Sequence, residues 1–131
     1  MKRIESLVRP NIRAMVPYST ARDEFKGVAE VFMDANESPF DNGYNRYPDP
    51  SQAKLKRRIA EIKGVDVQNI FVGNGSDEAI DLCFRIFCNP GLDNAIAIAP
   101  SYGMYSTCAA VNDVEMREVL LNDDFSLPVE R

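Results

Sequence analysis

The chain has 131 residues, 45% of them hydrophobic and 27% charged, and its formal net charge is -5 at pH 7. This length and composition are typical of about one folded domain with a hydrophobic core, and they exclude a disordered chain. The negative charge argues against a surface for nucleic acid or anionic membranes. Because the sequence contains no histidine, Ser-His-Asp and Cys-His catalysis, a histidine general base and histidine-ligated zinc are excluded within these residues.

The N-terminal residues and the cysteines show no pattern of export or of metal binding. Residues 1–10 include basic side chains, but the apolar stretch of a secretory signal does not follow them. No segment approaches the roughly 18 apolar residues of a membrane span. Cys83, Cys88 and Cys108 form no CxxC pair, so we expect reduced and mostly buried thiols. The sequence therefore predicts a cytoplasmic protein without a metal site.

Residues 1–50 are expected to form an irregular N-terminal arm. Proline interrupts both helices and sheet ladders. The segment contains Pro10, Pro17, Pro39, Pro48 and Pro50. Only residues 29–37, AEVFMDANE, have the pattern of a short strand. An arm of this length without its own core is either disordered or packed against another part of the protein.

An amphipathic helix is predicted in the sequence SQAKLKRRIAEIKG, which begins at Ser51 and ends at Gly64. Leu55, Ile59 and Ile62 recur at helical spacing on one face. Ser51 is the expected N-cap, and Gly64 is the expected stop at the C-terminal end.

Beyond this helix the hydrophobic pattern alternates between strands and helices. Strands are predicted over 70–72, 94–100 and 114–121, and helices over about 76–88 and 101–111. The run NAIAIAP (94–100) is continuously apolar, as in a strand that is buried on both faces. This order of elements predicts an α/β fold in which crossover helices join parallel strands.

The turn Gly-Asn-Gly-Ser at residues 73–76 lies between a predicted strand and a predicted helix. The first backbone N–H groups of a helix have no intrahelical acceptor, and the helix dipole adds partial positive charge there. The two glycines let a ligand approach the backbone closely, so the turn suits a phosphate group. Alternatively, Asn74 or Ser76 only caps the helix, with Asp77 and Glu78 complementing the dipole. The local sequence leaves both interpretations open.

Two nucleotide-binding motifs do not fit this turn. A dinucleotide fingerprint needs a third glycine where Glu78 stands, and a P-loop needs Gly-Lys-Ser/Thr. Asp77 and Glu78 would also repel a triphosphate, which favours a small ligand with a single phosphate. Tyr102 follows the apolar run, and the carboxyl ends of parallel strands share one edge of a sheet. We therefore expect Tyr102 near the turn, either stacked on a flat heteroaromatic ring or half-buried at a helix start.

Five segments carry a resemblance to a known family. They are VPYSTAR (16–22), DANESPF (34–40), NRYPDP (45–50), VGNGSDEAIDL (72–82) and PSYGMYS (100–106). In this order and spacing they resemble the first third of the histidinol-phosphate aminotransferases, which are class I and II aminotransferases of fold type I that use pyridoxal 5′-phosphate. Each segment alone is a weak signal, whereas five in register are a strong one.

The resemblance implies a partial three-layer α/β sandwich, the beginning of the large domain that binds pyridoxal phosphate in this fold type. Residues 1–50 would be an N-terminal arm with loops that contact the dimer partner and the substrate. Residues 51–131 would be the first, incomplete part of the large domain. Three strands leave a sheet edge and a helix face uncovered, so the segment alone is expected to be ordered only if it self-associates or rearranges.

The resemblance also assigns cofactor-binding residues. In relatives the backbone at the positions of Gly75, Ser76 and Asp77 holds the cofactor phosphate, and the position of Tyr102 stacks on the pyridine ring. The tyrosine of NRYPDP, which is Tyr47 here, reaches across a homodimer interface to the phosphate in the partner subunit.

Two further positions match substrate contacts of the family. Tyr18 matches a residue of the arm that closes over the substrate, and Asn36 matches a position that lines the substrate pocket. The implied reaction interconverts imidazole acetol phosphate plus glutamate and histidinol phosphate plus 2-oxoglutarate, in histidine biosynthesis. The lysine that forms a Schiff base with the cofactor lies beyond residue 131 in relatives, so the chain as given has no catalytic residue and is expected to be inactive alone.

Three alternatives remain open at this point. The substrate specificity could be that of another class I or II aminotransferase or of a related decarboxylase that acts on a phosphorylated substrate. The third alternative is a non-catalytic phosphate-binding module. Substrate choice depends heavily on residues that lie beyond residue 131 in relatives.

Overall fold

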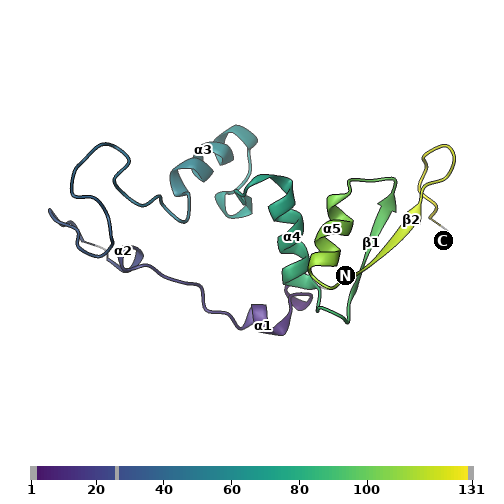
Figure 1. Ribbon diagram of the computed structural model, residues 1–131. Helices are drawn as coiled ribbons and strands as arrows, with labels where there is room; N and C mark the ends of the chain where they lie inside the picture. The colour runs from purple at the N-terminus through teal and green to yellow at the C-terminus, as the bar shows by residue number, and fades with distance from the viewer. Residues whose placement is uncertain (1–2, 26, 130–131) are drawn as a thin grey trace. The chain divides into compact units, whose positions relative to one another are not determined.

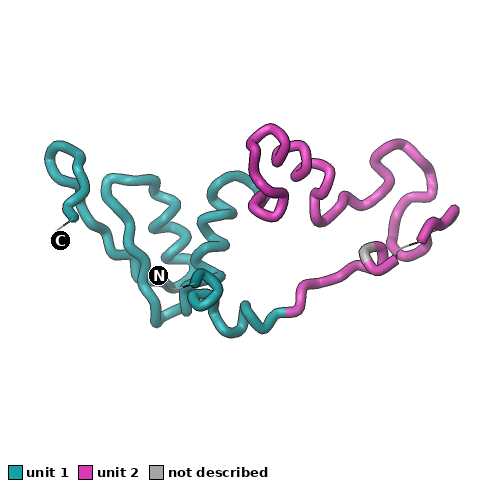
Figure 2. The backbone as a smooth tube through the Cα atoms, turned by 180° about the vertical axis from the view of Figure 1, so that it is seen from behind, with its two compact units in different colours: residues 1–15, 73–131 teal, residues 16–72 magenta. Residues whose placement is uncertain are grey.

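A computed structural model describes residues 3–25 and 27–129 of the chain (Figure 1). Two compact units are present: unit 1 combines residues 1–15 with 73–131, and unit 2 is formed by residues 16–72 (Figure 2). Unit 1 contains the 3-10 helix η1 (Ile4–Ser6), the helices α1 (Pro10–Arg13), α4 (Gly75–Phe87) and α5 (Met104–Val111), and the strands β1 (Asn94–Ala99) and β2 (Glu115–Leu120). Unit 2 contains the helices α2 (Ala21–Glu24) and α3 (Ala53–Lys63) and the 3-10 helix η2 (Val67–Asn69).

The centre of unit 1 is a strand–helix–strand arrangement made by β1, α5 and β2 (Figure 1). β1 and β2 pair in parallel, with Asn94 opposite Glu115 and Ala99 opposite Leu120. α4 packs against α5, and α5 packs against β2. The mixed α/β class and the parallel pairing expected from the sequence are therefore confirmed.

The hydrophobic core of unit 1 forms where α4 and α5 meet the sheet. It consists of Phe84, Cys108, Ala109 and Val114. Half-buried hydrophobic side chains surround it, namely Ile80, Cys88, Ala95, Met104 and Met116. The small side chains on α5 let this helix approach its neighbours closely, as the close packing of protein interiors requires.

The two faces of β1 differ in exposure. Its alanines at 95, 97 and 99 are half-buried on the face toward the core. Ile96 and Ile98 lie on the opposite face, and they are 72% and 40% exposed. The expectation of a strand buried on both faces was wrong for the described residues, because helices cover only one face of this sheet. The apolar sequence of β1 nevertheless suits a strand that a second layer covers.

Two predicted strands are absent from the described structure. Residues 70–72 follow η2, and Ile70 has the extended angles φ -112° and ψ 119°, but the segment is not part of a sheet. Residues 29–37 form bends and irregular backbone. An extended segment becomes a strand only when a neighbour supplies its ladder of hydrogen bonds, and the described residues supply none to either segment.

The start of α3 differs from the sequence prediction. The N-cap residue is Gln52 rather than Ser51, and its side chain makes no capping hydrogen bond. Oδ2 of Asp49 accepts from the N–H of Ala53, the first residue of the helix, at 2.8 Å, and its Oδ1 accepts from the N–H of Ser51 at 2.8 Å. The hydroxyl of Ser51 is also directed to Asp49, and this bond is the main reason that the pKa of Asp49 is lowered. At the other end Gly64 adopts φ +65° and stops the helix, as expected.

Arg9 ties the N-terminal residues of unit 1 to the C-terminal end of α4. Its backbone N–H donates to the carbonyl of Ile86 at 2.9 Å, and its Nη1 donates to the carbonyl of Arg85 at 2.8 Å. The last carbonyl groups of a helix have no intrahelical donor, so Arg9 supplies two donors where they are needed.

The cysteines are free thiols of unequal exposure. Cys108 is buried, Cys88 is half-buried and Cys83 is exposed on α4, so the expectation of mostly buried thiols was wrong for Cys83. Among the described residues, the helices are all too short or too polar to cross a membrane. No cluster of described acidic or cysteine side chains could hold a metal ion.

Candidate functional site

The first turn of α4 presents an open backbone. Gly75 begins the helix with φ +75°, a left-handed conformation that glycine adopts without strain. Among the described atoms, none lies within 4 Å of the place where a Cβ of residue 75 would stand. The N–H groups of Gly75, Ser76 and Asp77 belong to the first helical turn and so have no intrahelical acceptor. This turn therefore has these backbone hydrogen-bond donors next to open space that a ligand can occupy.

One of the two interpretations of this turn was that Asn74 caps the helix through its side chain, and the structure does not show that cap. Asn74 occupies the N-cap position, but its side chain makes no capping hydrogen bond. Instead, the backbone N–H of Asn74 donates to the carboxylate of Glu78. Asp77 and Glu78 both lie in the first turn, where negative charge complements the helix dipole.

Tyr102 lies beside this turn, as expected, although residues 70–72 before the turn do not pair in the sheet. Its hydroxyl donates a hydrogen bond to Oδ1 of Asp77 at 3.0 Å. The hydrogen bond to Asp77, and then the negative charge of Asp77, raise the pKa of the Tyr102 phenol, because both favour its neutral form. The ring also contacts Tyr105 edge to face, with 6.2 Å between the ring centroids. An aromatic ring, a carboxylate and a helix N-terminus thus meet in unit 1.

In unit 2, Tyr18 and Tyr47 line one surface pocket of about 710 Å³. Both side chains are well exposed, Tyr18 at 90% and Tyr47 at 64%. Ala35 and Glu37 also line the pocket, whereas Asn36 lies between them in sequence without being part of the wall. The structure therefore brings Tyr18 and Tyr47 to one cavity, and Asn36 is not among the residues that line it.

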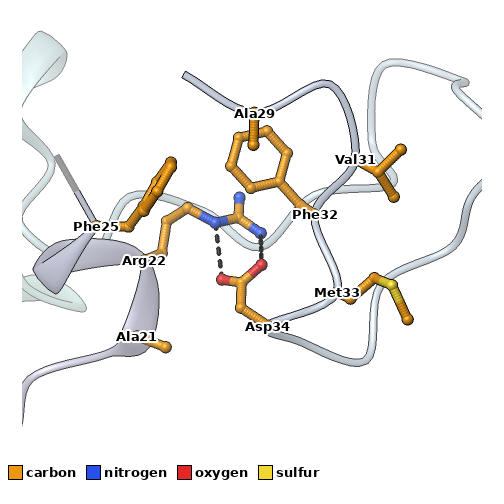
Figure 3. Close-up of a pocket in the computed structure, with 8 residues that line it drawn as sticks. All are labelled: Ala21, Arg22, Phe25, Ala29, Val31, Phe32, Met33 and Asp34. Carbon is orange, nitrogen blue, oxygen red and sulfur yellow. Dashed lines mark hydrogen bonds and ion pairs between the residues drawn. The ribbon is translucent and has the colours of Figure 1, made fainter. Parts of the chain in front are cut away.

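A cluster of charged residues lies beside this pocket and organises unit 2. Arg22 of α2 binds Asp34 through two parallel hydrogen bonds, Nε to Oδ2 at 2.8 Å and Nη2 to Oδ1 at 2.7 Å (Figure 3). The guanidinium also lies 4.2 Å from the ring centroid of Phe32, a cation–π arrangement. The hydrogen bonds between the two side chains, and then their opposite charges, raise the pKa of Arg22 and lower the pKa of Asp34.

A second, smaller pocket adjoins the Arg22–Asp34 pair. Its volume is about 270 Å³, and Phe25, Phe32 and Met33 are among the apolar side chains that line it (Figure 3). The rings of Phe25 and Phe32 meet edge to face with 6.4 Å between centroids. The stacking of Arg22 on this apolar wall helps to hold the guanidinium in position.

Glu37 and Arg46 are the residues of this region that the sequence analysis missed. Oε2 of Glu37 accepts hydrogen bonds from Arg22 at 3.1 Å and from Arg46 at 2.8 Å. Oε1 accepts from the backbone N–H of Tyr47 at 2.8 Å. The available signal was the opposite charge of residues within the segments DANESPF and NRYPDP, but an irregular segment has no periodicity to show which charges pair.

Comparisons with known proteins give the family. Residues 18–131 match the family model for aminotransferases of class I and II. The histidinol-phosphate aminotransferase of Parabacteroides distasonis is 60% identical over 130 residues, which cover 99% of this chain and 38% of that protein. The histidinol-phosphate aminotransferases of Bacteroides fragilis and Bacteroides thetaiotaomicron are each 58% identical and are also covered to 38%.

The match extends along almost the whole chain, whereas the chain spans just over a third of the length of these relatives. Tyr18, Tyr47, Asp77 and Tyr102 all lie within the matched residues 18–131. On this evidence the chain belongs to the class I and II aminotransferase family.

Proposed function

We propose that residues 1–131 form the N-terminal part of a histidinol-phosphate aminotransferase. The reaction is the exchange of an amino group between glutamate and imidazole acetol phosphate, which gives 2-oxoglutarate and histidinol phosphate. One observation carries this proposal: three relatives with that printed name match 99% or more of the chain at 58% to 60% identity. The protein then acts in histidine biosynthesis, in the cytoplasm.

The cofactor in this proposal is pyridoxal 5′-phosphate, and the first turn of α4 fits its phosphate. The open backbone at Gly75 and the exposed hydroxyl of Ser76 are next to N–H groups without intrahelical acceptors. Two nearby carboxylates would oppose a phosphate, but Glu78 is bound to the N–H of Asn74 and Asp77 is bound to Tyr102. Gly75, Ser76 and Asp77 would therefore hold the phosphate through their backbone.

Tyr102 would hold the ring of the same cofactor. Its side chain is 53% exposed, so a face of the ring is accessible for stacking on a flat heteroaromatic group. The hydrogen bond to Asp77 fixes the phenol relative to α4. When bound, pyridoxal phosphate supplies the electron sink that amino-group exchange requires. The residues of this chain bind and orient the cofactor.

Tyr47, Tyr18 and Asn36 would act from the arm. In this proposal Tyr47 reaches the cofactor phosphate of the partner subunit in a homodimer, while Tyr18 and Asn36 contact the substrate. Their high exposure supports such contacts, since Tyr18 and Tyr47 project into an open pocket rather than into a core. The parallel pair β1–β2, with its uncovered isoleucines, would be part of the three-layer sandwich of fold type I.

The test uses the enzyme that contains residues 1–131. The purified protein should form glutamate from 2-oxoglutarate when histidinol phosphate is the amino donor, and its gene should restore growth of a histidine auxotroph. Activity with other amino acids and none with histidinol phosphate would contradict the substrate and indicate another aminotransferase. Release of carbon dioxide instead would indicate the decarboxylase alternative, and binding of phosphate ligands without turnover would indicate a non-catalytic module.

A further inference from the structure

Glu37 is a carboxylate that unit 2 holds out of solvent. Its side chain is only 6% exposed, although it lies in an irregular segment without a helix or strand of its own. Burying a carboxylate is costly unless its charge is paired and its oxygen atoms accept hydrogen bonds. Both oxygen atoms of Glu37 are used: Oε2 by Arg22 and Arg46, and Oε1 by the N–H of Tyr47.

These contacts join three separate parts of unit 2. Arg22 comes from α2, Glu37 from the segment that follows Asp34, and Arg46 and Tyr47 from the sequence NRYPDP. The three hydrogen bonds lower the pKa of Glu37 from its ordinary value of 4.5 to about 2, with the bond from Tyr47 as the largest cause. The carboxylate therefore stays charged, and it keeps attracting both arginines over the physiological range of pH.

Tyr47 is restrained on both sides of its Cα. Its N–H is held by Glu37 at 2.8 Å, and Pro48 follows it, which restricts residue 47 to extended conformations. Asp49, two residues after Tyr47, is also held: its carboxylate accepts hydrogen bonds from the backbone N–H groups of Ser51 and Ala53 at the start of α3. The backbone is thus held while the tyrosine side chain remains 64% exposed. This arrangement fixes the direction in which an exposed side chain projects.

We propose that Glu37 is a positioning residue for Tyr47: it fixes the backbone of residues 45–47 so that the phenol of Tyr47 projects toward its ligand. This inference rests on the proposed function, in which that ligand is the phosphate of pyridoxal phosphate in the partner subunit. Glu37 itself does not contact the cofactor. It acts by lowering the entropy that Tyr47 loses when it binds.

The first measurement is hydrogen exchange in the cofactor-free enzyme that contains residues 1–131. Pro48 and Pro50 have no N–H, so a peptide over residues 44–50 reports mainly on the backbone at the site of interest. In Glu37→Gln, exchange of this peptide should become about tenfold faster, because its backbone opens more easily. The matched control is Glu61→Gln, which removes an exposed carboxylate from its ion pair with Arg58 on α3 and should leave exchange at 44–50 unchanged.

The second measurement is the dissociation constant of pyridoxal phosphate, determined by titration of the cofactor-free protein. Tyr47→Phe removes one hydrogen bond to a charged group and should weaken binding roughly tenfold. Glu37→Gln should weaken binding by a similar or smaller factor. In the double variant the Glu37→Gln change should have no further effect, because a positioning residue acts only through the group that it positions.

The outcomes separate the inference from the function on which it rests. Unchanged exchange at 44–50 in Glu37→Gln overturns the inference, and so does a full additional loss of affinity in the double variant. If Tyr47→Phe alone leaves the affinity unchanged, the proposed contact of Tyr47 with the cofactor is wrong, and exchange still decides whether Glu37 orders the loop. If Glu37→Gln does not fold, Arg46→Gln removes one of the two positive charges that pair with Glu37 and is measured in the same way.

Discussion

The hydroxyl of Tyr102 donates a 3.0 Å hydrogen bond to Oδ1 of Asp77, across 25 positions of sequence. The bond joins the loop between β1 and α5 to the first turn of α4, and it defines the candidate cofactor site in unit 1. Because Asp77 stabilises the neutral phenol, the pKa of Tyr102 is raised above its ordinary value of 10.0.

We predict that Asp77→Asn lowers the pKa of Tyr102 back toward 10.0, since the substitution removes the negative charge. The measurement is an ultraviolet titration of tyrosinate formation in the cofactor-free enzyme, with Tyr102→Phe to identify the contribution of this residue. Identical titration of Tyr102 in wild type and in Asp77→Asn would show that the charge of Asp77 does not act on the phenol in solution.

A second prediction concerns the backbone of Gly75. Gly75→Ala should destabilise the protein by about 1–2 kcal/mol, which is the cost of holding an ordinary residue in the left-handed conformation. The space around the position is open, so the cost arises from φ +75° and not from a clash. Gly103→Ala is the matched control, because Gly103 also has open surroundings but adopts right-handed helical angles.

Chemical unfolding of the enzyme measures both glycine variants under the same conditions. The free energy of unfolding should fall clearly for Gly75→Ala and little for Gly103→Ala. Equal losses for the two variants would mean that residue 75 relaxes out of the left-handed conformation at no cost.

A third prediction follows from the pKa of Glu37. The folded state holds this pKa at about 2 against an ordinary 4.5, so the unfolded chain takes up a proton first as the pH falls. The stabilisation by Glu37 is therefore fully present above pH 4.5 and is lost progressively as the pH falls toward 2. Thermal melts should show a difference between wild type and Glu37→Gln that is constant near neutral pH and shrinks below about pH 4.5.

The control for this experiment is again Glu61→Gln. The side chain of Glu61 is 65% exposed, and exposed ion pairs contribute little to stability. Its melting temperature should follow that of wild type at every pH. A Glu37→Gln difference that stays constant down to the acid limit would indicate a normal pKa and a weaker charge cluster.

The elements that periodicity could reveal were predicted from the sequence. α3, α4, α5, β1 and β2 lie where the hydrophobic patterns placed them, within a few residues, since burial of one face follows from the spacing of apolar side chains. The approach of Tyr102 to the start of α4 was also predicted. That expectation relied on a strand at 70–72 that ends at the same sheet edge, and the described residues do not form that strand.

The features that were missed depend on partners distant in sequence. Glu37 receives its three donors from Arg22, Arg46 and Tyr47, and charged side chains in an irregular segment have no repeat that identifies their partners. Residues 70–72 have a strand-like sequence, but pairing requires a neighbour that the described residues do not supply. The local sequence can favour an extended conformation, whereas a sheet forms only when another segment, often distant in sequence, pairs with it.

A fourth prediction concerns the 131-residue polypeptide expressed alone. Only four described residues form its buried core, while Phe71, Ile96 and Leu120 are 59%, 72% and 64% exposed. Apolar surface of this kind favours association, so the polypeptide should self-associate and should not catalyse amino transfer. Analytical ultracentrifugation over a range of concentrations measures the first property, and Ile96→Thr should weaken the association.

The opposite result would be a monomer at low concentration that unfolds in one cooperative transition. Such behaviour would mean that the 131-residue polypeptide buries enough apolar surface to be stable by itself. Amino transfer by the isolated polypeptide would contradict the proposal that the reactive lysine lies outside it.

The bonds from Arg9 to the end of α4 also constrain the order of folding during synthesis. Nη1 of Arg9 meets the carbonyl of Arg85, 76 positions later in the chain. A growing polypeptide leaves the ribosome from its N-terminus, so residues 3–15 emerge well before the helix that they contact exists. Residues 3–15 must therefore stay without these contacts while residues 16–72 form their own unit. They pack against the end of α4 only after α4 has been synthesised.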